Sequence, residues 1–195
     1  MKRLFLLPAF LLLAVASLYS QDIYDPDDEG DEYEFSYTLN EPGDQLIKVS
    51  LNLANPIKPE NLKLGGSGSL GYHRYLNPWF SLGVDICFGY NTTIGSNVFT
   101  YIPFIFDATY APTIGKFEFP VTLGIGFAVE NYLSMTYFPG LIIKPQIGAF
   151  YRIKPSWSLG IQCDYMFMPQ WYSKHPEYNY NGHFFDGGIS VRYHF

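Results

Sequence analysis

The sequence is poor in charged residues, and this shortage separates it from ordinary soluble domains. Only 15% of its 195 residues are Asp, Glu, Lys or Arg, whereas 19% are aromatic. Soluble domains average about 25% charged residues. The sequence beyond residue 20 also lacks an apolar run long enough for a transmembrane helix. A membrane location would therefore depend on β-strands, because only helices and closed barrels span a bilayer.

The sequence also lacks the common signatures of catalysis. It contains no G-x-S-x-G, H-E-x-x-H or P-loop motif, so we expect no enzyme activity, no cofactor and no metal site. A hydrolase-like site would need His175, His183, Asp186 and Ser173 to meet at one rim, and four common polar residues do not specify such a site. The acidic chain has no basic patch, which argues against nucleic acid as a partner.

The first 44 residues have the composition of a targeting segment and an acidic tail. Lys2 and Arg3 precede an apolar run over 4–13 and small residues over 14–20, a pattern typical of a signal peptide, residues 1–20. The stretch 22–44 then holds ten acids and no Lys or Arg. It lacks the ordered spacing of a calcium loop. We predict a disordered, periplasmic segment over 21–44.

Apolar and polar residues alternate from residue 45 to the end, which predicts strands with two different faces. In the last strand Phe185, Ile189 and Tyr193 alternate with polar residues. A terminal strand exposes an edge unless it pairs with the first strand and closes a barrel. We therefore predict an all-β domain over 45–195, an eight-stranded antiparallel up-and-down transmembrane β-barrel, with strands near 46–53, 62–75, 79–91, 98–110, 117–130, 141–152, 157–168 and 185–195.

The aromatic face of each strand is predicted to meet lipid. Bulky side chains from eight strands would overfill a narrow barrel, whereas the opposite, Gly- and Ser-rich face would fit inside it. That second face carries too little charge to be a soluble surface. Aromatic residues cluster at both strand ends, as interfacial girdles do. Cys87 is predicted to face the lumen and Cys163 the lipid, so they should not form a disulfide.

Three segments carry a family resemblance. Two are turn-to-strand segments, N-P-W-F-S-L-G-V (77–84) and K-P-S-W-S-L-G-I (154–161), and the third is the ending G-x-x-V-x-Y-x-F (188–195). The chain resembles the small eight-stranded bacterial outer-membrane barrels of the OmpW, OmpX and OmpA-transmembrane group. The resemblance implies an outer-membrane location, periplasmic N and C termini, and long extracellular loops. It also implies contacts with outer-membrane lipid and with the assembly machinery, which would read the terminal signal made by Gly188, Val191, Tyr193 and Phe195.

Charged residues on the inward face are the main candidates for function. Each would have to pair or contact water, because an unpaired buried charge is costly. They could form a salt-bridged plug or a narrow polar path, and the sequence leaves both open. The predicted network comprises Lys48, His73, Asp85, Asp107, Glu118, Lys144, Arg152, Asp164, Asp186 and Arg192.

Prolines inside the strands suggest a second feature. Pro103, Pro120 and Pro145 each remove a ladder hydrogen bond. In OmpW-like barrels a wall opening beside a proline is thought to release apolar solutes sideways. That resemblance makes Pro103 the candidate for a lateral opening. A bulge or a strand end is the alternative for the same residue.

Three functions remain open at this point. The first is a narrow pore or conduit for small solutes, with apolar solutes as one candidate class. The second is a surface-exposed binding protein or adhesin that contacts a host-surface ligand through loop aromatics, which are Trp171, Tyr172, Tyr178 and Tyr180. The third is a structural barrel with a sealed lumen.

Overall fold

The structure is a computed structural model that describes residues 40–132, 135–170 and 180–195. Their regular structure consists of eight long strands and two short ones. Within these residues no helix is long and apolar enough to cross a membrane. The strands are β1 (Gln45–Lys58), β2 (Gly65–Asn77), β3 (Phe80–Thr92), β4 (Val98–Tyr110), β5 (Thr113–Ile114), β6 (Phe117–Glu118), β7 (Val121–Tyr132), β8 (Met135–Lys154), β9 (Trp157–Gln170) and β10 (Tyr180–His194).

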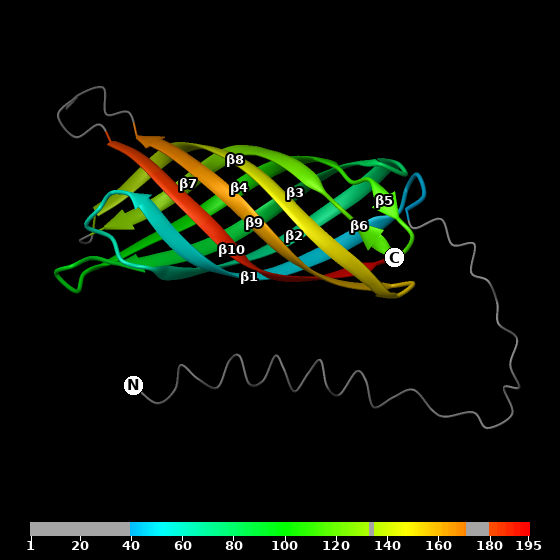
Figure 1. Cartoon of the computed structure of the whole chain (residues 1–195). Helices are drawn as coiled ribbons and strands as arrows, with labels where there is room; N and C mark the ends of the chain where they lie inside the picture. The colour runs from blue at the N-terminus through cyan, green and yellow to red at the C-terminus, as the bar shows by residue number, and fades with distance from the viewer. Residues whose placement is uncertain (1–39, 133–134, 171–179) are drawn as a thin grey trace, which may run out of the picture. The chain divides into compact units, whose positions relative to one another are not determined.

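The long strands form one closed antiparallel barrel (Figure 1). Each pairs with its neighbours in the chain, and β10 returns to pair with β1. In that seam Ser50 lies opposite Ser190, and the backbones of Gln45 and Phe195 exchange two hydrogen bonds of 2.9 and 3.0 Å. The predicted eight-stranded up-and-down barrel is confirmed. Closing the ring removes the free edge that the terminal strand would otherwise expose.

One side of the barrel is built from a broken strand. The predicted strand over 117–130 is divided into β6 and β7, and both parts pair with β8. The break falls at Phe119 and Pro120. Proline has no N–H to donate to the ladder, which explains why strand pairing stops there. The carbonyl of Pro120 still accepts a 3.0 Å hydrogen bond from the amide of Gly148, so the two parts continue in line.

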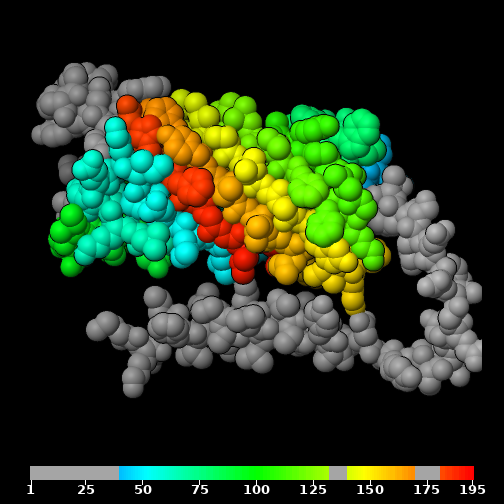
Figure 2. Space-filling model, viewed as in Figure 1, coloured from blue at the N-terminus to red at the C-terminus, as the bar shows by residue number. Residues whose placement is uncertain are grey.

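The two faces of the wall are the predicted ones. Leu123 is 51% exposed on the outside, whereas its neighbour Thr122 is 5% exposed and faces the lumen. Figure 2 shows one side of the outer surface, where side chains of adjacent strands lie against one another. Aromatic side chains are exposed at the end where the short turns lie, among them Trp79, Tyr110 and Phe195. An apolar outer wall of this kind requires lipid around it.

Several strands extend further than predicted at the opposite end, which we call the loop end. There β8 begins at Met135 rather than near 141, β10 begins at Tyr180 rather than near 185, and β1 continues to Lys58. Pairing continues in these extensions, as between Tyr132 and Met135. Backbone hydrogen bonding between strands does not require alternating polarity. The strands can therefore continue beyond the residues that show the alternating pattern.

The predicted disordered segment is too long at its C-terminal end. Residues 40–44 have a defined structure, with a turn at Pro42 and Gly43 before β1 begins. Asn40 is 2% exposed and contacts side chains inside the short-turn end of the barrel. Buried hydrogen bonds therefore order these residues despite their polar composition. The remainder of the predicted segment, 21–39, and the predicted signal peptide lie outside the described residues.

Candidate functional site: the barrel lumen

All ten charged or titratable side chains predicted to face the lumen are buried inside the barrel. None is more than 6% exposed. They come from seven of the long strands and from β6, so the barrel brings together residues that are far apart in the sequence. From the short-turn end to the loop end we distinguish a lower layer, a middle layer, an upper layer and an apolar cluster.

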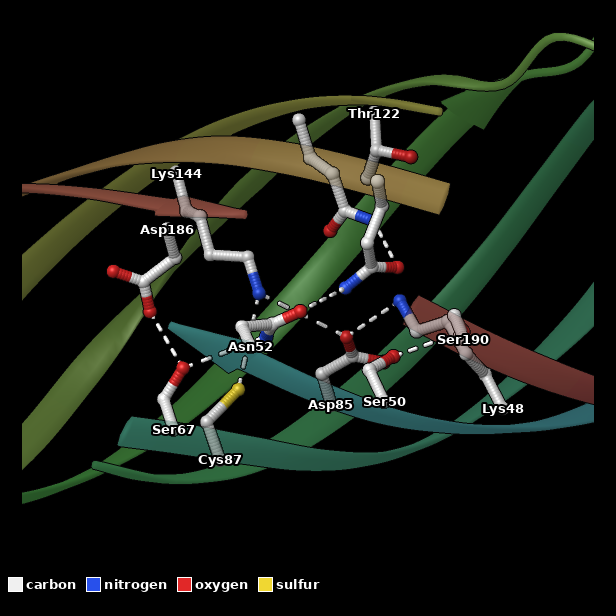
Figure 3. A network of polar contacts seen from close by, with 12 residues as sticks. Lys48, Ser50, Asn52, Ser67, Asp85, Cys87, Thr122, Lys144, Asp186 and Ser190 are labelled. Atoms are coloured by element: carbon white, nitrogen blue, oxygen red, sulfur yellow. Dashed lines mark hydrogen bonds and ion pairs between the residues drawn. The ribbon is translucent and has the colours of Figure 1, made fainter. Parts of the chain in front are cut away.

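The middle layer is organised around Asp85 on β3. Its Oδ2 lies 2.7 Å from the ammonium group of Lys48 and 4.0 Å from that of Lys144. Its Oδ1 lies 3.1 Å from Nε2 of His73. Figure 3 shows Asp85 between the two lysines, which reach it from opposite parts of the wall. Asp107 belongs to the same layer, because it lies within 4.8 Å of both His73 and Asp85.

The lower layer surrounds Glu118 on β6. Its carboxylate forms an ion pair with Arg192 and accepts hydrogen bonds from the hydroxyl of Tyr75 at 3.1 Å and the amide of Asn40 at 3.0 Å. Arg152 donates a 2.9 Å hydrogen bond to the side-chain oxygen of Asn40. Asn40 therefore joins an acid and a base across the short-turn end. Sequence reasoning missed it, because nothing in the acidic segment distinguishes it from its neighbours.

The upper layer contains two carboxylates that face each other across the β9–β10 ladder. Asp164 and Asp186 are direct cross-strand partners, an arrangement that is unfavourable for two like charges. The hydroxyl of Ser67 donates a 2.6 Å hydrogen bond to Asp186. One oxygen of each carboxylate has no hydrogen-bond partner within the described part of the chain. The upper layer is therefore rich in negative charge.

Apolar side chains fill the lumen nearer the loop end. This apolar cluster consists of Cys87, Tyr101, Ile105, Ala128, Ile142, Met166, Met168 and Phe184. Sequence analysis assigned Cys87 to the inward face but did not single out Ile142, Met166, Met168 or Phe184. These four residues have even numbers, and the odd-numbered residues of their strands face outward. That alternation could have assigned them to the lumen. The narrow interior accommodates these large side chains because many facing positions are glycine.

The β3–β4 and β8–β9 ladders have gaps beside the apolar cluster. Between β3 and β4, pairing skips from Ile86–Phe104 to Gly89–Tyr101, so the rungs at Cys87 and Phe88 are missing. Pro103 lies opposite Cys87 in this gap and its side chain is buried. Proline removes the hydrogen-bond donor there. The predicted lateral-opening residue therefore lies at an interruption of the β3–β4 ladder, and an opening there stays a prediction.

The second interruption is in the β8–β9 seam. Pairing skips from Ile143–Phe167 to Gln146–Asp164, and between these described strands it does not continue beyond Ile143 towards the loop end. Pro145 lies in the skipped stretch. The seam is therefore unpaired over a longer distance than the one beside Pro103. Sequence analysis noted Pro145 but did not select it as an opening.

Other predicted residues lie apart or outside the described chain. His183 is on the outer face, where its Nδ1 is 2.5 Å from the hydroxyl of Tyr165, whereas Asp186 points into the lumen. The wall therefore separates two members of the hydrolase-like set. The other two members and the aromatics Trp171, Tyr172 and Tyr178 lie outside the described residues, as does the side chain of Tyr180.

The proposed assembly signal comprises the last part of β10 and Phe195, which follows the strand. Gly188 lies opposite Asn52 in the β1–β10 seam, and Val191 lies opposite Val49. Tyr193 and Phe195 are 40% and 53% exposed, and their rings stack with centroids 5.9 Å apart. These aromatic side chains are therefore accessible from outside the barrel. Recognition by assembly machinery stays a prediction.

Comparisons with known proteins agree with this architecture. A family model matches residues 26–193. An uncharacterized protein of Treponema pallidum (strain Nichols) is 31% identical over 154 residues, which cover 69% of this chain and 70% of that protein. A second uncharacterized protein of the same organism is 28% identical over 142 residues, covering 66% of this chain and 48% of its own length.

Two solved structures are similar in fold. Neisserial surface protein A superposes with a TM-score of 0.63 at 14% identity, over 77% of this chain and 98% of that one. The outer membrane protein OprG from Pseudomonas aeruginosa superposes with a TM-score of 0.58 at 10% identity, over 82% and 99% of the two chains. At these identities the likeness shows the fold, which is that of the small outer-membrane barrels.

Proposed function

We propose that this chain is a bacterial outer-membrane barrel that conducts small apolar solutes. The chain belongs to the same family as the 31% identical Treponema pallidum protein. The exposed apolar wall and the fold support the location. In this proposal both chain ends are periplasmic, the loop end is extracellular, and solutes enter at the loop end and leave sideways through the wall. The longer connections 59–64 and 93–97 at the loop end support that orientation.

The division of the lumen into two chemically different parts carries the proposal. A solute entering from the loop end first meets the apolar cluster. Further passage along the axis is blocked by the upper, middle and lower layers, whose charged side chains are at most 6% exposed. Moving an apolar solute through these layers would require separating buried ion pairs, which costs several kcal/mol for each pair. A route through the wall avoids that cost.

The two ladder gaps lie where such a route would need them. Cys87 and Met166 belong to the apolar cluster, and each lies at a position where a ladder rung is missing. Fewer backbone hydrogen bonds hold the strands together at these points, so opening them costs less than opening an intact seam. The resemblance to OmpW-like barrels supports the same route.

A disulfide across the β3–β4 gap tests this route. In the Cys163→Ser background, Pro103→Cys would face Cys87, and opposed residues on antiparallel strands lie within disulfide range. The measurement is the rate at which an apolar fluorescent dye leaves or enters proteoliposomes. We expect oxidation to slow transfer and reduction of the same sample to restore it. A matched pair placed on β1 and β10, Ser50→Cys with Ser190→Cys in a cysteine-free background, should have no such effect.

Other results would indicate a sealed lumen, a water-filled pore or an opening at a different seam. Dye transfer no faster than in protein-free vesicles would indicate the sealed structural barrel. A steady ionic conductance across planar bilayers would indicate a water-filled pore. Transfer that is unchanged by the β3–β4 disulfide but slowed by a disulfide across β8–β9 would move the opening to the seam beside Pro145.

A further inference from the structure

Three lumenal side chains on neighbouring strands converge in the middle layer. His73 on β2, Asp85 on β3 and Asp107 on β4 each offer one ligand atom, and these atoms all lie within 4.8 Å of one another. Nε2 of His73 and Oδ1 of Asp85 are already 3.1 Å apart. Ligand atoms of a tetrahedral zinc site are about 3.4 Å apart when each is about 2.1 Å from the metal. The arrangement is thus close to that of three ligands around one ion.

Glycine residues provide the space for these three side chains. A Cβ on Gly83 would overlap the His73 ring, and one on Gly71 would overlap Oδ1 of Asp85. A Cβ on Gly124 would lie 2.5 Å from Oδ1 of Asp107. The backbone positions beside the three donors are therefore empty of side chains. The side chains of His73, Asp85 and Asp107 occupy the space above these glycines and point towards one another.

Within the part of the chain that the structure describes, the carboxylate of Asp107 lacks the partners that a buried carboxylate normally has, which indicates a missing ligand. It is 2% exposed, and neither of its carboxylate oxygens has a hydrogen-bond partner among the described residues. Asp85, in contrast, is held by Lys48 and His73. A buried carboxylate without a partner costs several kcal/mol, so such groups are normally paired or coordinate a metal.

The charge balance of the lumen is consistent with a bound dication. The middle and upper layers contain two ammonium groups, Lys48 and Lys144, and four carboxylates: Asp85, Asp107, Asp164 and Asp186. With neutral histidine these two layers carry a net charge of −2, which one divalent cation would cancel. The ligand set of one imidazole nitrogen and two carboxylate oxygens suits Zn²⁺ better than Ca²⁺ or Mg²⁺, which prefer all-oxygen sites.

We propose that His73, Asp85 and Asp107 bind one Zn²⁺ ion inside the barrel. The ion would connect the neighbouring strands β2, β3 and β4 on the lumenal side of the wall. This site goes beyond the proposed conduit function, because it lies below the apolar cluster and does not depend on a lateral opening. It also replaces the expectation from the sequence that the chain has no metal site.

Zinc titration of the full mature chain, refolded in detergent after treatment with a chelator, tests the proposal. We expect one Zn²⁺ per barrel by calorimetry and by metal analysis. Asp107→Asn preserves the shape of the side chain but removes its charge, and it should weaken binding at least about tenfold, since loss of an outer-shell partner alone costs about 10–100-fold. The matched control is Asp186→Asn, a buried lumenal carboxylate outside the three ligands, which should retain the site.

Each possible outcome decides the question. Heat-modifiable gel migration verifies that each variant is folded, and His73→Gln replaces Asp107→Asn if the latter does not fold. Absence of stoichiometric binding by the folded wild-type barrel overturns the proposal. Equal affinity in the wild type and a folded ligand variant also overturns it, because the ion would then be bound elsewhere. Equal loss in Asp186→Asn would assign the effect to lumenal charge and likewise reject these three ligands.

Discussion

The ion pair between Lys48 and Asp85 should be a major determinant of barrel stability. At 2.7 Å, two unit charges attract by about 6 kcal/mol at an effective dielectric constant of about 20. Lys144, at 4.0 Å, contributes about 4 kcal/mol by the same relation. Desolvation offsets much of this attraction. Removing one partner of a buried pair nevertheless costs about 3–5 kcal/mol, because the other charge is left in the interior.

We therefore expect Lys48→Met to lower the free energy of unfolding by about 3 kcal/mol, the lower end of that range. Asp85 keeps its hydrogen bond to His73 and its attraction to Lys144, which limits the loss. The double variant Lys48→Met with Asp85→Asn should recover part of the stability, because residue 85 no longer carries a charge that has lost its Lys48 partner. This recovery distinguishes the loss of charge pairing from the loss of packing.

Reversible urea unfolding in lipid vesicles, followed by tryptophan fluorescence and gel migration in the presence of a chelator, measures both variants. A loss of less than about 1 kcal/mol for Lys48→Met would refute the reasoning, since that is the usual effect of an unremarkable substitution. A double variant that is no more stable than Lys48→Met would also contradict it. Either result would mean that water already screens Asp85 inside the barrel.

The same unfolding assay checks three further predictions. Leu123→Arg places a charge on the lipid-facing wall and should cost about 2–4 kcal/mol, whereas Ile114→Arg at the short-turn end should cost at most about 1 kcal/mol; equal costs would contradict the membrane depth assigned to Leu123. Gly188→Ala should cost about 1–3 kcal/mol because its methyl group would overlap the backbone of β1, while the adjacent Gly187→Ala meets no atom within 4 Å and should be neutral or slightly stabilising. Asn40→Ala removes two buried hydrogen bonds and should cost about 1–3 kcal/mol, and a neutral effect would show that residues 40–44 are not held by them.

The faces of the strands could be predicted from the sequence, because a period of two assigns every residue of a strand once one residue is assigned. Thr122 and Leu123 are correctly separated on this basis, as are Cys87, which is buried, and Cys163, which is partly exposed. The closing of β10 onto β1 followed from the need to protect a terminal edge. These inferences required only local patterns and a general property of sheets.

The partners of lumenal charges could not be predicted in the same way. Glu118 contacts Arg192, which is 74 residues away and reaches it across the interior. Such a contact depends on the stagger between strands and on side-chain length, and neither is contained in an alternating pattern. Lys48 on β1 and Asp85 on β3 belong to strands that do not pair with each other, yet their charged groups are 2.7 Å apart. The ladder gap beside Pro103 could be suspected from the proline, but its extent depends on the register of β3 and β4.

The seam between β1 and β10 also restricts the order of events during biogenesis. Ser50 meets Ser190 across 140 positions of the chain, so the earliest strand to be synthesised waits for the latest one before its second edge is covered. Contacts of such long sequence separation form slowly. Until then an open, aromatic sheet would be exposed to other chains. The barrel can consequently close only after β10 is available to pair with β1.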